Sequence, residues 1–155
     1  MADFEIAVQL TLKNEGGFVD NPADPGGATN MGIEQRDLPN ISIRTLTVAQ
    51  AVAYYRETYW KSLYSEITSQ LIANKLFDLG VLFGIGTAVK NLQGALSLFA
   101  DGDFGPVTLA AANEAEPTEL LSEFKLKMRA RATAIVIMNP KEAEFLNGWI
   151  RRINS

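Results

Sequence analysis

Apolar residues recur at steps of three and four along most of this chain, and a single glycine- and proline-rich stretch, residues 16–33, interrupts the pattern. That repeat is typical of one face of a helix with 3.6 residues per turn. It appears in residues 3–15, 47–60, 69–83, 89–99 and 117–135, and in a last segment after residue 140. Because no strand-rich region, internal repeat or linker accompanies it, the sequence predicts an all-α fold with a small β-hairpin near the N-terminus.

Local residues mark where these helices begin. Asp3 is placed to cap the first helix, and Thr47 with Gln50 forms a capping box for the second. Pro106 and Pro117 suit the first position of two later helices, since proline there loses no helical hydrogen bond. On the last helix, Phe145, Trp149 and Ile153 form an apolar face that predicts docking against the core, with Arg151 and Arg152 expected to be exposed.

Residues 16–33 are too rich in glycine, proline and asparagine for a helix. Asp24-Pro25-Gly26-Gly27 suits a turn, in which proline fixes one φ and glycine supplies a positive one. We therefore expect a hairpin between Phe18 and Ile33.

Composition excludes several kinds of chemistry. The chain has 155 residues, enough for one domain with a real core, and contains no Cys and no His. Disulfides, thiolate nucleophiles, imidazole bases and the commonest zinc ligands are thereby removed, which leaves carboxylates to carry acid–base chemistry. The segment 101–105, Asp-Gly-Asp-Phe-Gly, lacks the distant bidentate Glu of a calcium loop. We expect no metal and no cofactor.

Charge is distributed unevenly. Residues 1–119 hold 7 Lys and Arg against 15 Asp and Glu, whereas residues 120–155 hold 7 against 3. The basic end is explained either by solvated helix faces or by a surface that meets an anionic cell wall. The acidic total argues against nucleic acid as a partner. No apolar run suggests a signal peptide or membrane insertion, so the product is expected in the cytoplasm until it is released.

Glu15, Asp24 and Thr29 form the strongest candidate site. Glu15 ends an amphipathic helix, and Asp24 lies in a turn-rich loop, so two carboxylates are placed in two environments. Such a pair allows one acid to stay protonated while the other stays ionised, as in enzymes that hydrolyse sugar bonds. A purely structural explanation is also open, in which Glu15 is a solvated helix end and Asp24 initiates a turn. Asp20 competes for the role of second carboxylate.

The same stretch resembles a known family. An early Glu15-Gly16-Gly17 followed by Asp24-Pro25-Gly26-Gly27-x-Thr29-x-x-Gly32-Ile33 is similar to the N-acetylmuramidases called glycoside hydrolase family 108. Later landmarks follow in the family's order: Tyr59-Trp60, Phe77-Asp78, Asp101-Gly102-Asp103-Phe104-Gly105-Pro106-x-Thr108-Leu109 and Phe145-Leu146-x-Gly148-Trp149-Ile150-x-Arg152.

The resemblance implies a lysozyme-like domain over residues 1–155, with a catalytic part at about 1–90 and a peptidoglycan-binding-like helical part at about 91–155. It implies that Glu15 is the general acid. Phage lysozymes carry a similar Glu, Asp, Thr succession, which implies that Asp24 acts as base or electrostatic stabiliser and that Thr29 orients the attacking water. Substrate contacts are expected from Phe18, Gly27, Tyr59 and Trp60, although packing explains Tyr59-Trp60 more simply and a tight turn explains the glycine. Two departures bear on substrate preference: Phe18 replaces a usual Tyr, and Leu82 replaces an expected Asn.

The expected reaction is hydrolysis of the β-1,4 bond between N-acetylmuramic acid and N-acetylglucosamine in peptidoglycan glycan strands. The protein would act as a monomeric phage or prophage endolysin, or as a secreted bacterial muramidase, on the wall outside the membrane. Two alternatives remain open on sequence grounds. A lytic transglycosylase would use Glu15 without water, and a wall-binding protein would keep the fold without turnover.

Overall fold

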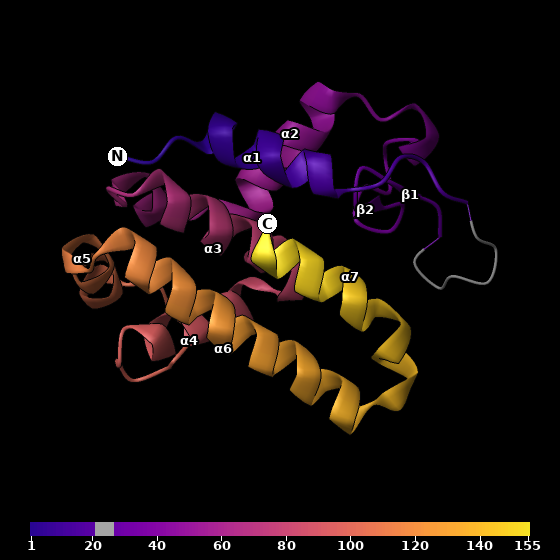
Figure 1. Ribbon diagram of the computed structural model, residues 1–155. Helices are drawn as coiled ribbons and strands as arrows, with labels where there is room; N and C mark the ends of the chain where they lie inside the picture. The colour runs from indigo at the N-terminus through magenta and orange to yellow at the C-terminus, as the bar shows by residue number, and fades with distance from the viewer. Residues whose placement is uncertain (21–26) are drawn as a thin grey trace.

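The computed structural model describes residues 1–20 and 27–155. Within them the chain forms seven α-helices and one two-stranded antiparallel sheet (Figure 1). The α-helices are α1 Phe4–Asn14, α2 Val48–Tyr59, α3 Gln70–Phe83, α4 Ile85–Ala95, α5 Pro106–Glu114, α6 Pro117–Met138 and α7 Ala143–Asn154. The strands are β1 Thr29–Asn30 and β2 Ile33–Glu34, and 3₁₀ turns lie at η1 Ile43–Thr45, η2 Ser62–Glu66 and η3 Pro140–Glu142. The all-α fold with a small hairpin near the N-terminus is confirmed.

The predicted helix starts are confirmed. Asp3 accepts a hydrogen bond from the Glu5 backbone N–H, and Thr47 and Gln50 cap each other reciprocally. Pro106 and Pro117 stand in the first turns of α5 and α6.

The prediction for the fourth helix was wrong at its C-terminal end. α4 ends at Ala95 rather than near Phe99, and the Phe99 side chain is 87% exposed. The Gln93 side chain accepts a hydrogen bond from Gly102 N (2.9 Å) and donates to Asp101 Oδ1 (2.7 Å). These bonds draw the following loop back over the helix end, and this long-range pairing outweighs the apolar spacing.

The hairpin is shorter than the predicted range, residues 18–33. β1 and β2 pair with Thr29 opposite Glu34, and Val19 adds an isolated bridge to Thr29. Met31 and Gly32 form the tip with φ of 49° and 75°, the two positive values that a type I′ turn requires. Of the expected turn at residues 24–27, only Gly27 belongs to the described residues.

Two clusters of buried side chains form the core. One gathers α1, α2 and the hairpin, and the other gathers α3 to α7. Helix α3 lies between them and packs against α1, α4 and α6. Trp60 contacts both clusters, and its ring lies 5.4 Å from Phe4, 5.7 Å from Phe77 and 5.6 Å from Tyr64 between centroids. The C-terminal end of α7 lies near the C-terminal end of α1 and alongside α3, where Arg152 forms ion pairs with Glu15 and Asp78 (Figure 1).

None of the described helices combines the length and the apolar character that crossing a membrane requires.

Candidate active site

Glu15 is the residue at which α1 stops. Its backbone is extended, with φ −82° and ψ 147°, while its N–H still donates to Thr11 O at 3.1 Å. Gly16 and Gly17 follow, and they favour leaving the helix because glycine is a poor helix former. The side chain is 14% exposed, so this carboxylate is not the solvated helix end that the simpler interpretation required.

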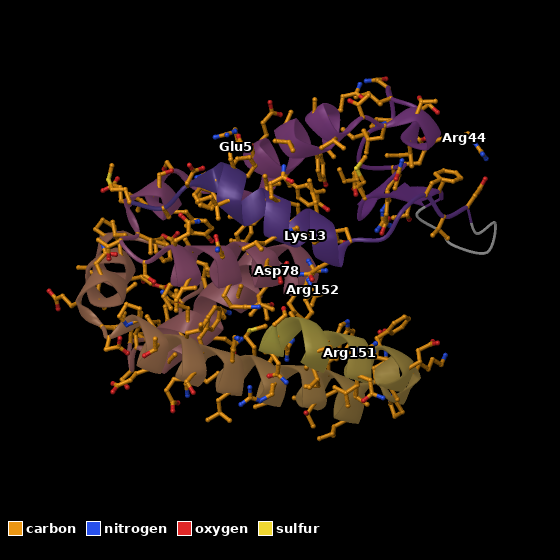
Figure 2. All side chains as sticks on the ribbon, turned by 45° about the horizontal axis from the view of Figure 1, so that its top comes forward. Glu5, Lys13, Arg44, Asp78, Arg151 and Arg152 are labelled. Atoms are coloured by element: carbon orange, nitrogen blue, oxygen red, sulfur yellow. The ribbon has the colours of Figure 1, made fainter. Side chains whose placement is uncertain are left out.

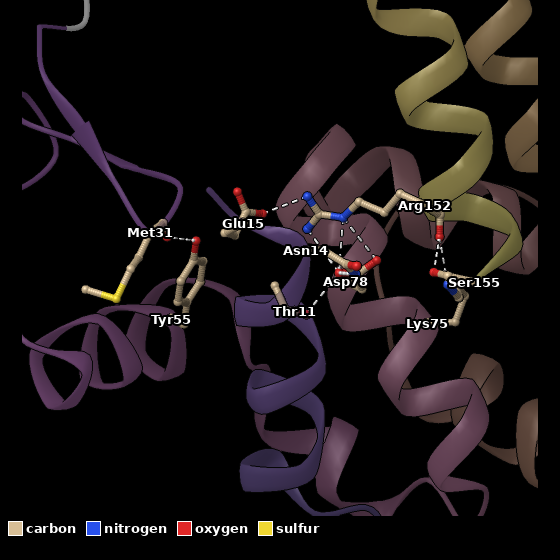
Figure 3. A network of polar contacts seen from close by, with 9 residues as sticks. All are labelled: Thr11, Asn14, Glu15, Met31, Tyr55, Lys75, Asp78, Arg152 and Ser155. Atoms are coloured by element: carbon tan, nitrogen blue, oxygen red, sulfur yellow. Dashed lines mark hydrogen bonds and ion pairs between the residues drawn. The ribbon is translucent and has the colours of Figure 1, made fainter. Parts of the chain in front are cut away.

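The tip of the hairpin lies against Glu15 (Figure 3). A Cβ on Gly32 would contact the Glu15 carboxylate and would lie 2.6 Å from Tyr55 Oη. Glycine is therefore required at position 32 for two reasons: its positive φ and the close approach of Glu15 and Tyr55 to its backbone. Tyr55 donates from Oη to Met31 O at 2.8 Å and so anchors the strained tip to α2. Burial, and next the negative charge of Glu15, raise the pKa of Tyr55, which keeps its hydroxyl protonated.

Arg152 corrects the expectation that this side chain is exposed. It reaches from α7 to within 2.7 Å of Glu15 Oε1 through Nη1, and it is only 11% exposed. Nε and Nη2 donate to Asp78 on α3 at 3.0–3.2 Å, which makes the fork geometry of a bidentate Arg–carboxylate pair. One guanidinium thus joins Glu15 to a second, more deeply buried carboxylate (Figure 3).

Asp78 is held from α1 as well. Its Oδ1 accepts hydrogen bonds from Thr11 Oγ1 (3.1 Å) and Asn14 Nδ2 (3.2 Å). Burial lowers the pKa of Arg152, but the hydrogen bond and charge of Asp78 and the charge of Glu15 together raise it above its usual value. The guanidinium therefore stays charged, and Asp78 holds it facing Glu15.

Lys75 extends this network to the α7 backbone. Its Nζ donates to Arg152 O at 3.0 Å, and burial lowers its pKa against the opposing charge of Asp78. The end of α7 is thus fixed at both the backbone and the side chain of Arg152.

The other predicted catalytic residues lie on or near the hairpin. Asp24 lies outside the described residues, so its role stays a prediction. Thr29 exchanges backbone hydrogen bonds with Val19 at 2.7 and 2.8 Å, and directly opposite it stands Glu34. Because directly opposed residues share one face of a sheet, the side chains of Thr29 and Glu34 lie on the same face. The rival carboxylate Asp20 is 53% exposed and pairs with Arg44 at 3.3 Å.

The four predicted substrate contacts have different surroundings. Phe18 is half-buried under the Arg44 guanidinium, which lies 4.5 Å from the ring centroid. Gly27 has φ 79° and lies beside Gln35. Tyr59 is half-buried, and burial raises the pKa of its hydroxyl.

Trp60, the fourth, is packed among three rings, and its Nε1 donates to Ser65 Oγ at 3.0 Å. Those contacts match the packing interpretation. A role in sugar binding stays a prediction for all four residues.

Sequence reasoning missed Arg152, Asp78 and Tyr55 as members of the site. Asp78 carried a signal, because a carboxylate between Phe77 and Leu79 in an apolar helix needs a buried partner. Nothing local indicated that the partner lies 74 residues further along the chain. Among the described residues, no group of three or more acidic side chains is arranged to hold a metal ion.

Comparison with known proteins identifies the family of this site. Residues 8–84 match the family described as "Glycosyl hydrolase 108", and residues 87–154 match the "Predicted Peptidoglycan domain". The solved structure titled "Structure of Brucella abortus SagA" is 30% identical, with a TM-score of 0.80 over 97% of this chain and 89% of that one. The chain belongs to glycosyl hydrolase family 108. No match was found among curated proteins.

Membership in family 108 and the peptidoglycan domain together support a peptidoglycan hydrolase of the glycoside hydrolase class. The fold is lysozyme-like. Glu15, Gly32, Tyr55 and Asp78 fall inside the family 108 match, whereas Arg152 falls inside the peptidoglycan domain. The site is therefore assembled from both matched segments.

Proposed function

We propose that this protein is an N-acetylmuramidase that hydrolyses the β-1,4 bond between N-acetylmuramic acid and N-acetylglucosamine. The proposal rests on Glu15, a largely buried carboxylate at a helix end. The turn at Gly32 lies against this carboxylate, and Arg152 binds one of its oxygens. Peptidoglycan strands are the substrate class that both family matches favour.

Glu15 acts as the general acid, and its Oε2 carries the proton because Arg152 occupies Oε1. A glycan bound across the site excludes the water that still reaches Glu15, and the proton is then transferred to the leaving oxygen.

Asp24 and Thr29 hold the water that attacks the opposite face of the sugar, and the reaction inverts the anomeric centre. Thr29 supports this role because β1 places it on the hairpin whose tip lies against Glu15. Inversion requires the two carboxyl groups to stand roughly 6.5 to 9.5 Å apart, against about 5 to 5.5 Å for retention. NMR of the first product distinguishes the two courses, since retention of the β configuration would contradict inversion.

The chain acts as one unit, with a catalytic part at about 1–90 and a wall-binding part at about 91–155. The ion pairs of Arg152 with Glu15 and Asp78 support a unit, because they join the two parts inside the site. We infer that the protein works as a monomer on the wall, as an endolysin or as an exported bacterial muramidase.

Glu15→Gln tests the assignment of the acid. The amide keeps the size of the side chain but cannot donate the required proton, so sacculus clearing should fall ~10² to 10⁴-fold. Circular dichroism should show an unchanged fold. Clearing at close to the wild-type rate would remove Glu15 from the mechanism.

A further inference from the structure

A groove of about 450 Å³ lies between α7 and the ends of α1 and α3. Its walls include Asn14, Leu82, Gly148, Trp149, Arg151 and Arg152. Asn14 directly precedes Glu15 in the chain, and Arg152 binds Glu15 Oε1. The groove therefore lies next to the residues that flank and hold the acid, on the side formed by the C-terminal helix.

The walls of the groove combine apolar surface with one cation. Leu82 and Trp149 are half-buried, and the Trp149 ring packs 5.5 Å from Phe83 and 6.1 Å from Phe145 between centroids. Gly148 presents no side chain, and a Cβ added there would meet no atom within 4 Å. Gly148 therefore leaves room for a side chain where it lines the groove.

Arg151 supplies the cation. It is exposed and forms no ion pair with any residue that the structure describes. Figure 2 shows it on α7 itself, whereas its neighbour Arg152 reaches across to Asp78. One of two adjacent arginines thus serves the acid, and the other is available to a ligand.

We propose that this groove binds the peptide stem that muramic acid carries on its lactyl group. The inference rests on the proposed function and adds that peptide-bearing strands are the preferred substrate. A groove this near the acid lies within reach of a substituent on the sugar whose bond is cleaved. The stem offers methyl groups for Leu82 and Trp149 and free carboxylates for Arg151, a charged partner that an uncharged sugar ring lacks.

The first test fills the groove without disturbing the fold. Gly148→Leu places a side chain in open space inside a helix, where leucine is a better helix former than glycine. Gly86→Leu is the matched control, since Gly86 is also helical, has nothing within 4 Å and lies outside the groove. Both variants are made in the Glu15→Gln background, so that binding is measured without turnover.

Titration calorimetry then compares a muramic acid–glucosamine disaccharide carrying a tetrapeptide with the same disaccharide without it. The parent should bind the peptide-bearing ligand more tightly, and Gly148→Leu should remove that preference while Gly86→Leu keeps it. Equal affinity of the parent for both ligands, or an unchanged preference in Gly148→Leu, would overturn the proposal.

The second test removes the cation. Arg151→Met should weaken binding of the peptide-bearing ligand about twofold to fivefold, in the range of exposed charge pairs. Lys141→Met, an exposed lysine on η3 outside the groove, should leave that binding unchanged. Equal losses in the two variants would mean that net charge, not the groove, attracts the ligand.

Turnover separates this inference from the proposed function. If the wild-type protein binds the peptide-bearing ligand preferentially but releases no product, the groove assignment stands and the proposed muramidase activity is contradicted. If the wild-type protein cleaves peptide-bearing and peptide-free strands with equal kcat/KM, the muramidase activity stands and the groove assignment is contradicted.

Discussion

Removal of the Arg152 guanidinium should destabilise the fold more than any other single charge deletion on α7. Arg152→Met leaves two carboxylates without their cation, Asp78 at 6% and Glu15 at 14% exposure. Breaking a buried pair from one side costs about 3–5 kcal/mol. Asp78 keeps its hydrogen bonds from Thr11 and Asn14, which places the expected loss near the lower end, about 3 kcal/mol.

For a domain of this size, a loss of about 3 kcal/mol corresponds to a fall in Tm of roughly 6 to 12 °C. The free energy of unfolding is measured by urea denaturation followed by circular dichroism. Arg151→Met is the matched control, because its side chain is exposed and should change stability by less than about 0.5 kcal/mol. Arg152→Lys should fall between the two, since one ammonium lacks the fork that reaches both carboxylates.

A double-mutant cycle tests whether the loss comes from the ion pair itself. Replacing both partners of a buried pair by apolar residues is often close to neutral. Asp78→Leu combined with Arg152→Met should therefore cost at least about 1.5 kcal/mol less than the sum of the two single variants. Additive losses, or a loss below about 1 kcal/mol in Arg152→Met alone, would refute the reasoning.

Three further predictions concern the residues around the site and the core. Gly32→Ala should lower both stability in urea denaturation and activity in sacculus clearing, because its Cβ meets the Glu15 carboxylate and its φ is 75°. Gly16→Ala should be tolerated in the same two assays, because a Cβ there meets nothing within 4 Å. Tyr64→Phe should leave the free energy of unfolding unchanged or slightly raised, since the hydroxyl is buried without a partner among the described residues; a loss above about 1 kcal/mol would reveal a hidden partner. Burial, and next the charge of Tyr59, raise the pKa of Tyr54 to about 12, so the folded state holds a proton that the unfolded state loses near pH 10. Stability should therefore fall as pH rises from about 10 toward 12, and a flat series of urea midpoints over that range would contradict it.

Local signals were sufficient to predict most of the fold. Asp3, the Thr47 capping box and the two helix-opening prolines act within one turn of the helix they start, so the sequence alone is informative there. The end of α4 was not predictable in this way. It depends on Gln93, whose side chain bonds to Thr108 at 3.1 Å and to Asp103 O at 3.0 Å, beyond the range of any helical repeat.

The candidate site was predictable only in part, for the same reason. The helix end at Glu15 follows from the two glycines after it, and the hairpin follows from the composition of residues 16–33. Arg152 was expected to be exposed because it lies beside the apolar face of its own helix. Its burial depends on Asp78, which lies opposite it once α7 packs on α6 and joins the core that includes α3. Periodicity describes one helix at a time and carries no information about such a pair.

Mass spectrometry of the muropeptides released from purified sacculi tests the central claim most directly. A hydrolase that uses Glu15 as acid and water as nucleophile should release fragments that end in reducing muramic acid. Glu15→Gln should release them ~10² to 10⁴-fold more slowly. Anhydro-muramic acid ends would instead identify a lytic transglycosylase, and intact sacculi after incubation with the wild-type protein would contradict the proposed activity.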